Sequence, residues 1–175
     1  MKNDIFEEYL IEKEPLKYEK GYAWHTAIGL QAVDGLDTSE YLISTAKKNI
    51  EGDITFEQAN ELIHSYYKEN VKHNSNDRTE EADKVSVHIA QILSEKSFVF
   101  SPAQYVSIHH RLFEGIYNHA GKIRDYNISK PEWVLDGDTV TYGGALDLRA
   151  TIDYDFSVEK EFSYKGLSID ETIKH

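Results

Sequence analysis

Apolar residues recur at helical spacing along most of this chain. The longest stripe follows Thr55, and others lie within 82–93, 105–116 and 146–156. Because residues three and four apart share one face of a helix, each stripe predicts an amphipathic helix that packs against a core. The stripe after Thr55 is made by Phe56, Ala59, Leu62, Ile63, Tyr66 and Tyr67. The pattern as a whole predicts a mostly α fold.

Helix boundaries are marked by capping residues. Thr38 or Ser39 is expected to cap a helix that runs to about Ile50, with Gly52 at its end. Pro15 is expected to end a short helix at 3–10, since proline breaks a helix interior. Capping boxes, in which side chains satisfy free backbone amides, are predicted at Thr55–Gln58, Ser101–Gln104 and Ser168–Glu171.

The apolar pattern changes to alternation between Trp133 and Tyr142. Asp136-Gly137 stands between the two apolar runs, and this dipeptide favours a tight hairpin turn. A β-hairpin is therefore predicted over 133–142. A helix ending at Gly121 is expected before it, and another helix after Gly143-Gly144.

Composition narrows the class of protein. The 175 residues suit one domain or one domain with a small module, and 40% hydrophobic residues suffice for a packed core. The net charge of −12 argues against nucleic-acid binding. The chain lacks cysteine, an apolar stretch long enough to span a bilayer, and an amino-terminal apolar signal segment. A cytoplasmic protein without a membrane partner is expected.

The sequence contains no familiar catalytic or metal-binding motif. The histidines are scattered, and His109 and His110, being adjacent on a helix, point in different directions. Phosphate-loop, zinc-protease and serine-hydrolase signatures are absent. We therefore predict no catalytic residue and no metal ligand in this chain.

Residues 110–135 resemble the first half of a Fic/Doc domain, the fold that transfers AMP from ATP to protein hydroxyls. The similarity covers about 80–175 and rests on Arg111, Leu112, Phe113, Tyr117, Ala120, Gly121, Arg124, Ile128, Ser129 and Lys130. It implies a helical core with one β-hairpin flap that adds a strand of the target protein through backbone hydrogen bonds.

In this resemblance the flap residues are Trp133, Val134, Val140 and Tyr142. Lys130 lies where the family's flap approaches the nucleotide, so it is a candidate for nucleotide binding; a solvated surface lysine is the alternative. A hairpin that only covers the core, with tryptophan as a packing residue, is the alternative for the flap. Arg124 has two interpretations: it orders the turn below the flap, or it contacts substrate.

Residues 27–67 resemble the three-helix antitoxin module that accompanies some Fic proteins. There, the glutamate of [S/T]-x-x-x-E-[G/N] pairs with a catalytic-loop arginine and stops productive ATP binding. The aligned residues here are Leu30, Asp34 and Gly35, so an aspartate, shorter by one methylene, replaces the glutamate. Asp34 and Gly35 are the inhibitory candidates; the alternative is a plain turn.

The predicted organisation is an arm at 1–20, an antitoxin-like module at 21–70 and, after a polar linker at 69–77, the first half of a Fic domain at 78–175. The family motif H-x-F-x-[D/E]-G-N-x-R, which supplies the base, the phosphate loop and the metal ligand, is absent. A helix start at Ser168 so near the last residue suggests truncation, and a frayed tail is the other interpretation.

Three hypotheses follow for function. The chain is an inactive amino-terminal portion of an adenylyltransferase, with ATP and Mg²⁺ implied as co-substrate and metal and Ser, Thr or Tyr hydroxyls as acceptors. Alternatively, it is a non-catalytic module that binds a full-length Fic partner or its target, or a remnant without a selected role. Expected partners are the target of the flap, a second copy or the absent half of the Fic domain. Phosphorylation instead of adenylylation stays open.

Overall fold

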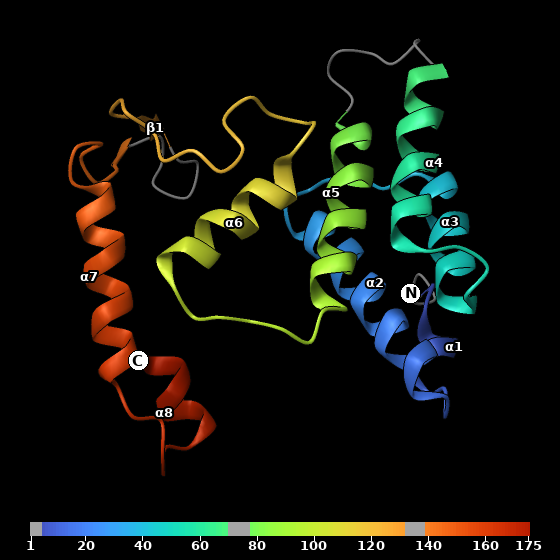
Figure 1. Cartoon of the computed structure of the whole chain (residues 1–175), viewed down its shortest axis with the longest axis horizontal. Helices are drawn as coiled ribbons and strands as arrows, with labels where there is room; N and C mark the ends of the chain where they lie inside the picture. The colour runs from blue at the N-terminus through green and yellow to red at the C-terminus, as the bar shows by residue number, and fades with distance from the viewer. Residues whose placement is uncertain (1–4, 70–77, 132–138) are drawn as a thin grey trace. The chain divides into compact units, whose positions relative to one another are not determined.

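The computed structural model describes residues 5–69, 78–131 and 139–175, and these are mostly helical (Figure 1). The elements in chain order are α1 (Glu7–Leu10), α2 (Pro15–Val33), α3 (Glu40–Glu51), α4 (Phe56–Glu69), α5 (Thr79–Leu93), α6 (Pro102–Phe113), β1 (Ser129–Pro131), β2 (Thr139–Thr141), α7 (Leu148–Glu161) and α8 (Ile169–Lys174). The predicted mostly α class is confirmed.

The chain forms two compact units. Unit 1 comprises 1–98 and 108–120, and unit 2 comprises 99–107 and 121–175. The predicted division near 70–78 falls inside unit 1, because α5 packs against α2 and α4. Val87 and Ala90 of α5 belong to the same buried cluster as Trp24 of α2. The first helix assigned to the Fic-like half therefore completes the core of the amino-terminal helices.

Unit 1 has a continuous apolar core around α2. Trp24 is fully buried, and its ring stacks on Phe56 with centroids 5.9 Å apart. Its indole N–H donates to Asn49 Oδ1 at 3.0 Å, and the Asn49 amide donates to the Ile54 carbonyl at 3.0 Å. A buried indole thus has its hydrogen-bond partner, and the two bonds of Asn49 join α2 and α3 to the segment before α4 inside an apolar core.

Close packing of α1 on α2 depends on Gly21. A Cβ at Gly21 would lie 2.5 Å from the Cβ of Tyr9, which is closer than real carbon atoms approach. Tyr9 itself is buried on this contact. The prediction that Pro15 ends a helix is wrong: Pro15 is the first residue of α2, where its missing N–H has no partner to lose and its fixed φ suits the helix.

Other predicted boundaries are confirmed. Ser39 caps α3 by accepting from the Leu42 amide at 3.0 Å, and Gly52 ends the helix with φ of +89°. The Ser168–Glu171 capping box has both of its hydrogen bonds. The prediction for α6 is wrong at its carboxyl end: the helix stops at Phe113, with Gly115 at φ of +73°, rather than at Gly121.

Unit 2 has little apolar burial of its own. None of the described residues of α6, α7 and α8 is buried, and Leu146 is 95% exposed. The rings of Phe100 and Phe156 lie with centroids 4.6 Å apart, and Tyr105 and Phe156 with centroids 6.0 Å apart. This small aromatic cluster joins α7 to the beginning of α6.

The strands of unit 2 form an antiparallel pair. Ser129 lies opposite Thr141, Lys130 opposite Val140 and Pro131 opposite Thr139. The described strand β1 ends at Pro131, before the run that the sequence pattern predicts as a strand. The Asp136-Gly137 turn lies outside the described residues, as does the first apolar run that was predicted as a strand.

Candidate functional site

Asp34 and Gly35 form the carboxyl end of α2. The Leu36 amide donates to the Gln31 carbonyl at 2.9 Å, and the Gly35 amide donates to the Ala32 carbonyl at 3.1 Å. With Gly35 at φ of +70°, these two bonds make a Schellman motif, which satisfies carbonyls that a helix end leaves free. The predicted turn is present, and its hydrogen-bond pattern fixes the direction in which the chain leaves α2.

The carboxylate of Asp34 occupies an electrostatically unfavourable position. It is exposed at the negative end of the α2 dipole, where a positive group would be preferred. Within residues 5–69, 78–131 and 139–175 it has no hydrogen-bond or ion-pair partner. A cation brought to this helix end would therefore meet an accessible carboxylate with no internal competitor among the described residues.

The candidate flap is described only at its base. Lys130 and Val140 face each other in the β1–β2 register, and Tyr142 follows β2 with 39% of its surface exposed. Trp133 and Val134 lie outside the described residues. The backbone of a two-stranded pair has one outward edge on each strand, so both strands offer groups for an added strand.

Arg124 holds the two ends of this strand pair together. Its Nη1 donates to the Tyr126 carbonyl at 2.7 Å, before β1, and its Nη2 donates to the Gly143 carbonyl at 2.5 Å, after β2. Nearby, Asn127 Oδ1 accepts from the Ala145 amide at 2.8 Å. Both guanidinium hydrogen bonds go to backbone carbonyls of this chain. Of the two interpretations of Arg124, this geometry matches the residue that orders a turn.

Unit 2 contains a pocket of about 590 Å³ between the start of α6, residues 121–123 and α7. Lys122 and Arg149 bring positive charge to its lining, and Asp153 brings negative charge. The remaining lining residues are Pro102, Ala103, Val106, Gly121, Ile123 and Ile152. The pocket thus combines an apolar surface with charged residues on its lining.

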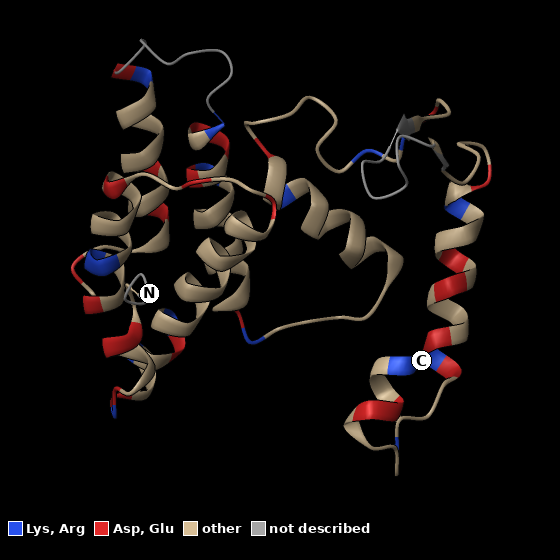
Figure 2. Ribbon diagram, turned by 180° about the vertical axis from the view of Figure 1, so that it is seen from behind, with Lys and Arg blue, Asp and Glu red and all other residues tan. Residues whose placement is uncertain are grey.

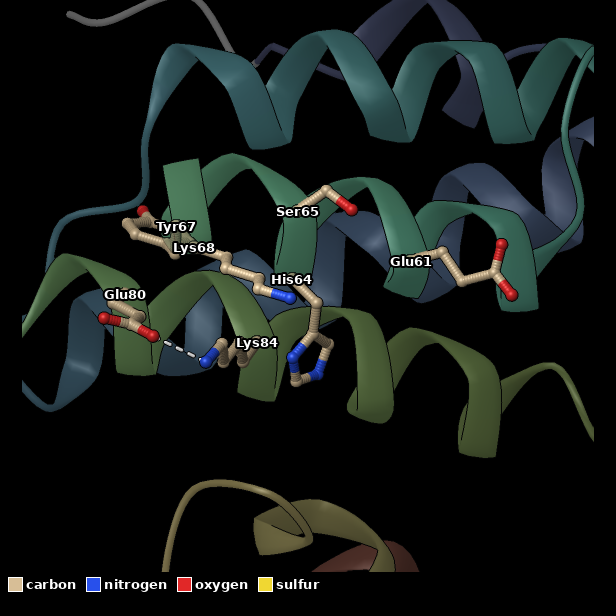
Figure 3. Close-up of a pocket in the computed structure, with 7 residues that line it drawn as sticks. All are labelled: Glu61, His64, Ser65, Tyr67, Lys68, Glu80 and Lys84. Atoms are coloured by element: carbon tan, nitrogen blue, oxygen red, sulfur yellow. Dashed lines mark hydrogen bonds and ion pairs between the residues drawn. The ribbon is translucent and has the colours of Figure 1, made fainter. Parts of the chain in front are cut away.

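A second pocket, of about 480 Å³, lies between α4 and α5 in unit 1 (Figure 3). Its lining is polar and consists of Glu61, His64, Ser65, Tyr67, Lys68, Glu80 and Lys84. Lys84 pairs with Glu80 at 2.5 Å, and its side chain is only 12% exposed. Burial and the positive charge of Lys84 lower the pKa of His64 below its ordinary value, so the ring is mainly neutral at pH 7.

Sequence reasoning missed this second pocket. In the sequence His64 is one of several scattered histidines, and Lys68 and Lys84 belong to no motif. A partial signal exists, because positions 61, 64, 65 and 68 share the face of α4 next to its apolar stripe, and Glu80 and Lys84 are four residues apart on α5. The contact between the two helix faces is tertiary and could not be read from either segment alone.

The buried carboxylate of Asp83 was also missed. Oδ1 accepts from the Ser39 amide at 2.9 Å, while Oδ2 accepts from the Ser39 hydroxyl at 2.5 Å and the Tyr67 hydroxyl at 2.6 Å. Asp83 is fully buried. Asp83 follows Ala82 of the apolar stripe on α5. Helical periodicity does not distinguish it from the other polar residues of that helix.

Charge is unevenly distributed over the helices (Figure 2). Helix α7 carries four acidic residues but only two basic ones, Arg149 and Lys160.

Among residues 5–69, 78–131 and 139–175, no group of three or more His, Cys, Asp or Glu side chains could hold a metal ion. In the same residues no helix combines the length and hydropathy needed to cross a membrane.

Comparison with known proteins gives no relative. No family model, curated protein or solved structure matches the chain.

Proposed function

We propose that this chain takes part in Fic-type protein adenylylation as a target-binding and inhibitory portion without catalytic residues of its own. The observation that carries the proposal is the bracing of the β1–β2 pair by Arg124 at the position where the sequence resembles the base of a Fic flap. A braced pair keeps its outer edge preorganised, which lowers the entropy cost of adding an extended target segment.

Recognition by this edge uses backbone hydrogen bonds and so makes little demand on target sequence. The target segment would carry the Ser, Thr or Tyr hydroxyl that accepts AMP. ATP and Mg²⁺ belong to the catalytic motif, which this sequence lacks, so we assign them to no residue here. The chain by itself is expected to transfer no AMP.

A second candidate function is inhibition of a Fic enzyme in trans, and Asp34 favours it. Its carboxylate is exposed, and no described residue pairs with it, at a helix end fixed by the Schellman motif. An arginine from a catalytic loop would gain a charge-assisted hydrogen bond there and would remove the electrostatic penalty at the end of α2.

One kinetic experiment tests both candidates. The complete chain is added to an active Fic-domain enzyme that lacks its own inhibitory helix, and transfer of labelled AMP from ATP to the target protein is measured. Inhibition that is competitive with the target protein supports the strand pair, and inhibition that is competitive with ATP supports Asp34. Asp34→Asn should weaken the ATP-competitive part about tenfold, the loss expected for one charge-assisted hydrogen bond.

Asp34→Glu is the matched variant, because it restores the longer side chain of the antitoxin motif and keeps the charge. It should inhibit at least as well as the original chain. Asp37→Asn, an exposed change of the same kind three residues away, should have no effect. If the chain fails to inhibit at any concentration with Asp or Glu at position 34, the inhibitory function is wrong; if the target protein does not compete, the flap function is wrong.

A further inference from the structure

The pocket between α4 and α5 gathers hydrogen-bond donors from both helices. Figure 3 shows the Lys68 ammonium and the His64 ring extending towards the same part of the pocket, whereas the carboxylate of Glu61 points away from them. Lys68 is exposed and has no ion-pair partner among the described residues, and Ser65 adds a hydroxyl. Lys84 is held at the pocket by Glu80.

The pKa of His64 reflects burial and nearby positive groups. After burial, the largest effects on its pKa come from Lys84 and His88, which lower it, and Glu80 opposes them more weakly. Glu61 and Lys68 are the other charged groups on the facing surface of α4. The segment around Gly115 backs the ring, since a Cβ there would lie 3.6 Å from His64 Cε1. The pocket lining holds two ammoniums, Lys68 and Lys84, and two carboxylates, Glu61 and Glu80, and Lys84 is paired with Glu80. Attraction of an anion therefore rests on Lys68, which has no ion-pair partner among the described residues.

We propose that this pocket binds the phosphate group of a small molecule, with Lys68, Lys84 and Ser65 donating hydrogen bonds to its oxygens. A phosphate offers three strong acceptor oxygens, which suits several donors better than the two oxygens of a carboxylate do. The pocket of about 480 Å³ exceeds the size of orthophosphate, so there is room for an organic group attached to it. The proposal concerns α4 and α5 and does not depend on the proposed function.

Binding is coupled to the protonation of His64. A phosphate beside the ring stabilises the imidazolium and raises the pKa that burial and Lys84 lower. By linkage, a phosphate of fixed charge binds more tightly as pH falls through the pKa of His64, because the ring then carries a positive charge.

The proposal is tested by nuclear magnetic resonance titration of the complete chain with inorganic phosphate and separately with AMP. The His64 Cε1 proton is followed at a fixed ionic strength of about 0.15 M, where surface charges more than about 8 Å apart are largely screened. We expect a saturable shift and a raised pKa of His64 in the bound form. Lys68→Gln should weaken binding about tenfold, as expected for the loss of one hydrogen bond to a charged group.

Lys48→Gln is the control, because Lys48 is an exposed lysine on α3 that does not line the pocket and the charge change is the same. Its affinity for both probes should match that of the original chain. Equal affinities for phosphate and AMP mean that the phosphate alone is recognised, and tighter binding of AMP means that the attached group adds contacts. A shift that grows linearly with either anion, or equal losses in Lys68→Gln and Lys48→Gln, would overturn the proposal.

Discussion

At the scale of single residues, Asp83 has the largest structural consequence. Its buried carboxylate accepts three hydrogen bonds from Ser39 and Tyr67, and Ser39 is also the cap of α3. One side chain on α5 thereby fixes the beginning of α3 and the end of α4. The same low dielectric that strengthens these bonds makes a donor without its acceptor costly.

Asp83→Asn should lower the free energy of unfolding by about 2–3 kcal/mol, because hydrogen bonds to a charged acceptor become bonds to a neutral amide and one donor faces the new NH₂ group. Urea denaturation followed by circular dichroism measures the change. Tyr67→Phe should cost less, about 1 kcal/mol, and the two changes should be non-additive because they share a bond. Asp37→Asn serves as the exposed control. A change below about 0.5 kcal/mol in Asp83→Asn, the size typical of surface substitutions, would show that the carboxylate is not needed.

At the scale of elements, the strand pair depends on a side chain outside both strands. Two three-residue strands have few hydrogen bonds, and an isolated pair of this kind is marginal in water. Arg124 compensates by joining the segments before β1 and after β2 through two carbonyls. The planar guanidinium suits this geometry, since its two donors diverge at a fixed angle.

Arg124→Lys should loosen the strand pair although the charge is kept, because one ammonium cannot span both carbonyls with the guanidinium geometry. Amide hydrogen exchange at Lys130 and Val140 is expected to accelerate about tenfold, which corresponds to one lost hydrogen bond. Exchange at Trp24 in unit 1 is the internal control and should not change. Unaltered protection at the strand residues would mean that the pair is stable without the brace.

At the scale of the whole molecule, the two units differ in how much they bury. Unit 1 holds the continuous core around Trp24, while the described helices of unit 2 bury no residue fully. Conditions that destabilise a buried core are therefore expected to affect mainly the stability of unit 1. Alkaline pH is such a condition, because the pKa values of Tyr9 and Tyr67, which both belong to the buried core of unit 1, are raised.

Alkaline pH is expected to destabilise unit 1. Burial, followed by Glu51, raises the pKa of Tyr9 from 10.0 to about 12, and burial, followed by Asp83, raises the pKa of Tyr67 as well. A raised pKa means that the folded state favours the neutral phenol, so this contribution is complete below pH 10 and falls as pH rises from 10 through 12. Urea unfolding at several pH values measures it. Tyr9→Phe should lessen the decline, and equal declines in both proteins would contradict the assignment.

The sequence alone determined the helical class and several helix boundaries of unit 1. These features are local: Ser39, Gly52 and the Thr55–Gln58 box act within one turn, so their effect is independent of distant residues. Pro15 shows the limit, since proline occurs both after the end and at the beginning of helices, and here it is the first residue of α2. The Asp34-Gly35 turn was likewise predictable from its residue types.

The tertiary structure alone decided what lies together across the chain. The pocket of His64 and Lys84 requires α4 beside α5, and the brace of Arg124 reaches residues 2 and 19 positions away. Asp83 could not be identified from periodicity, because its role depends on three hydrogen-bond donors that belong to Ser39 at the start of α3 and Tyr67 of α4. Periodicity reports which face of a helix is apolar, but the partner of that face is set by packing between segments distant in sequence.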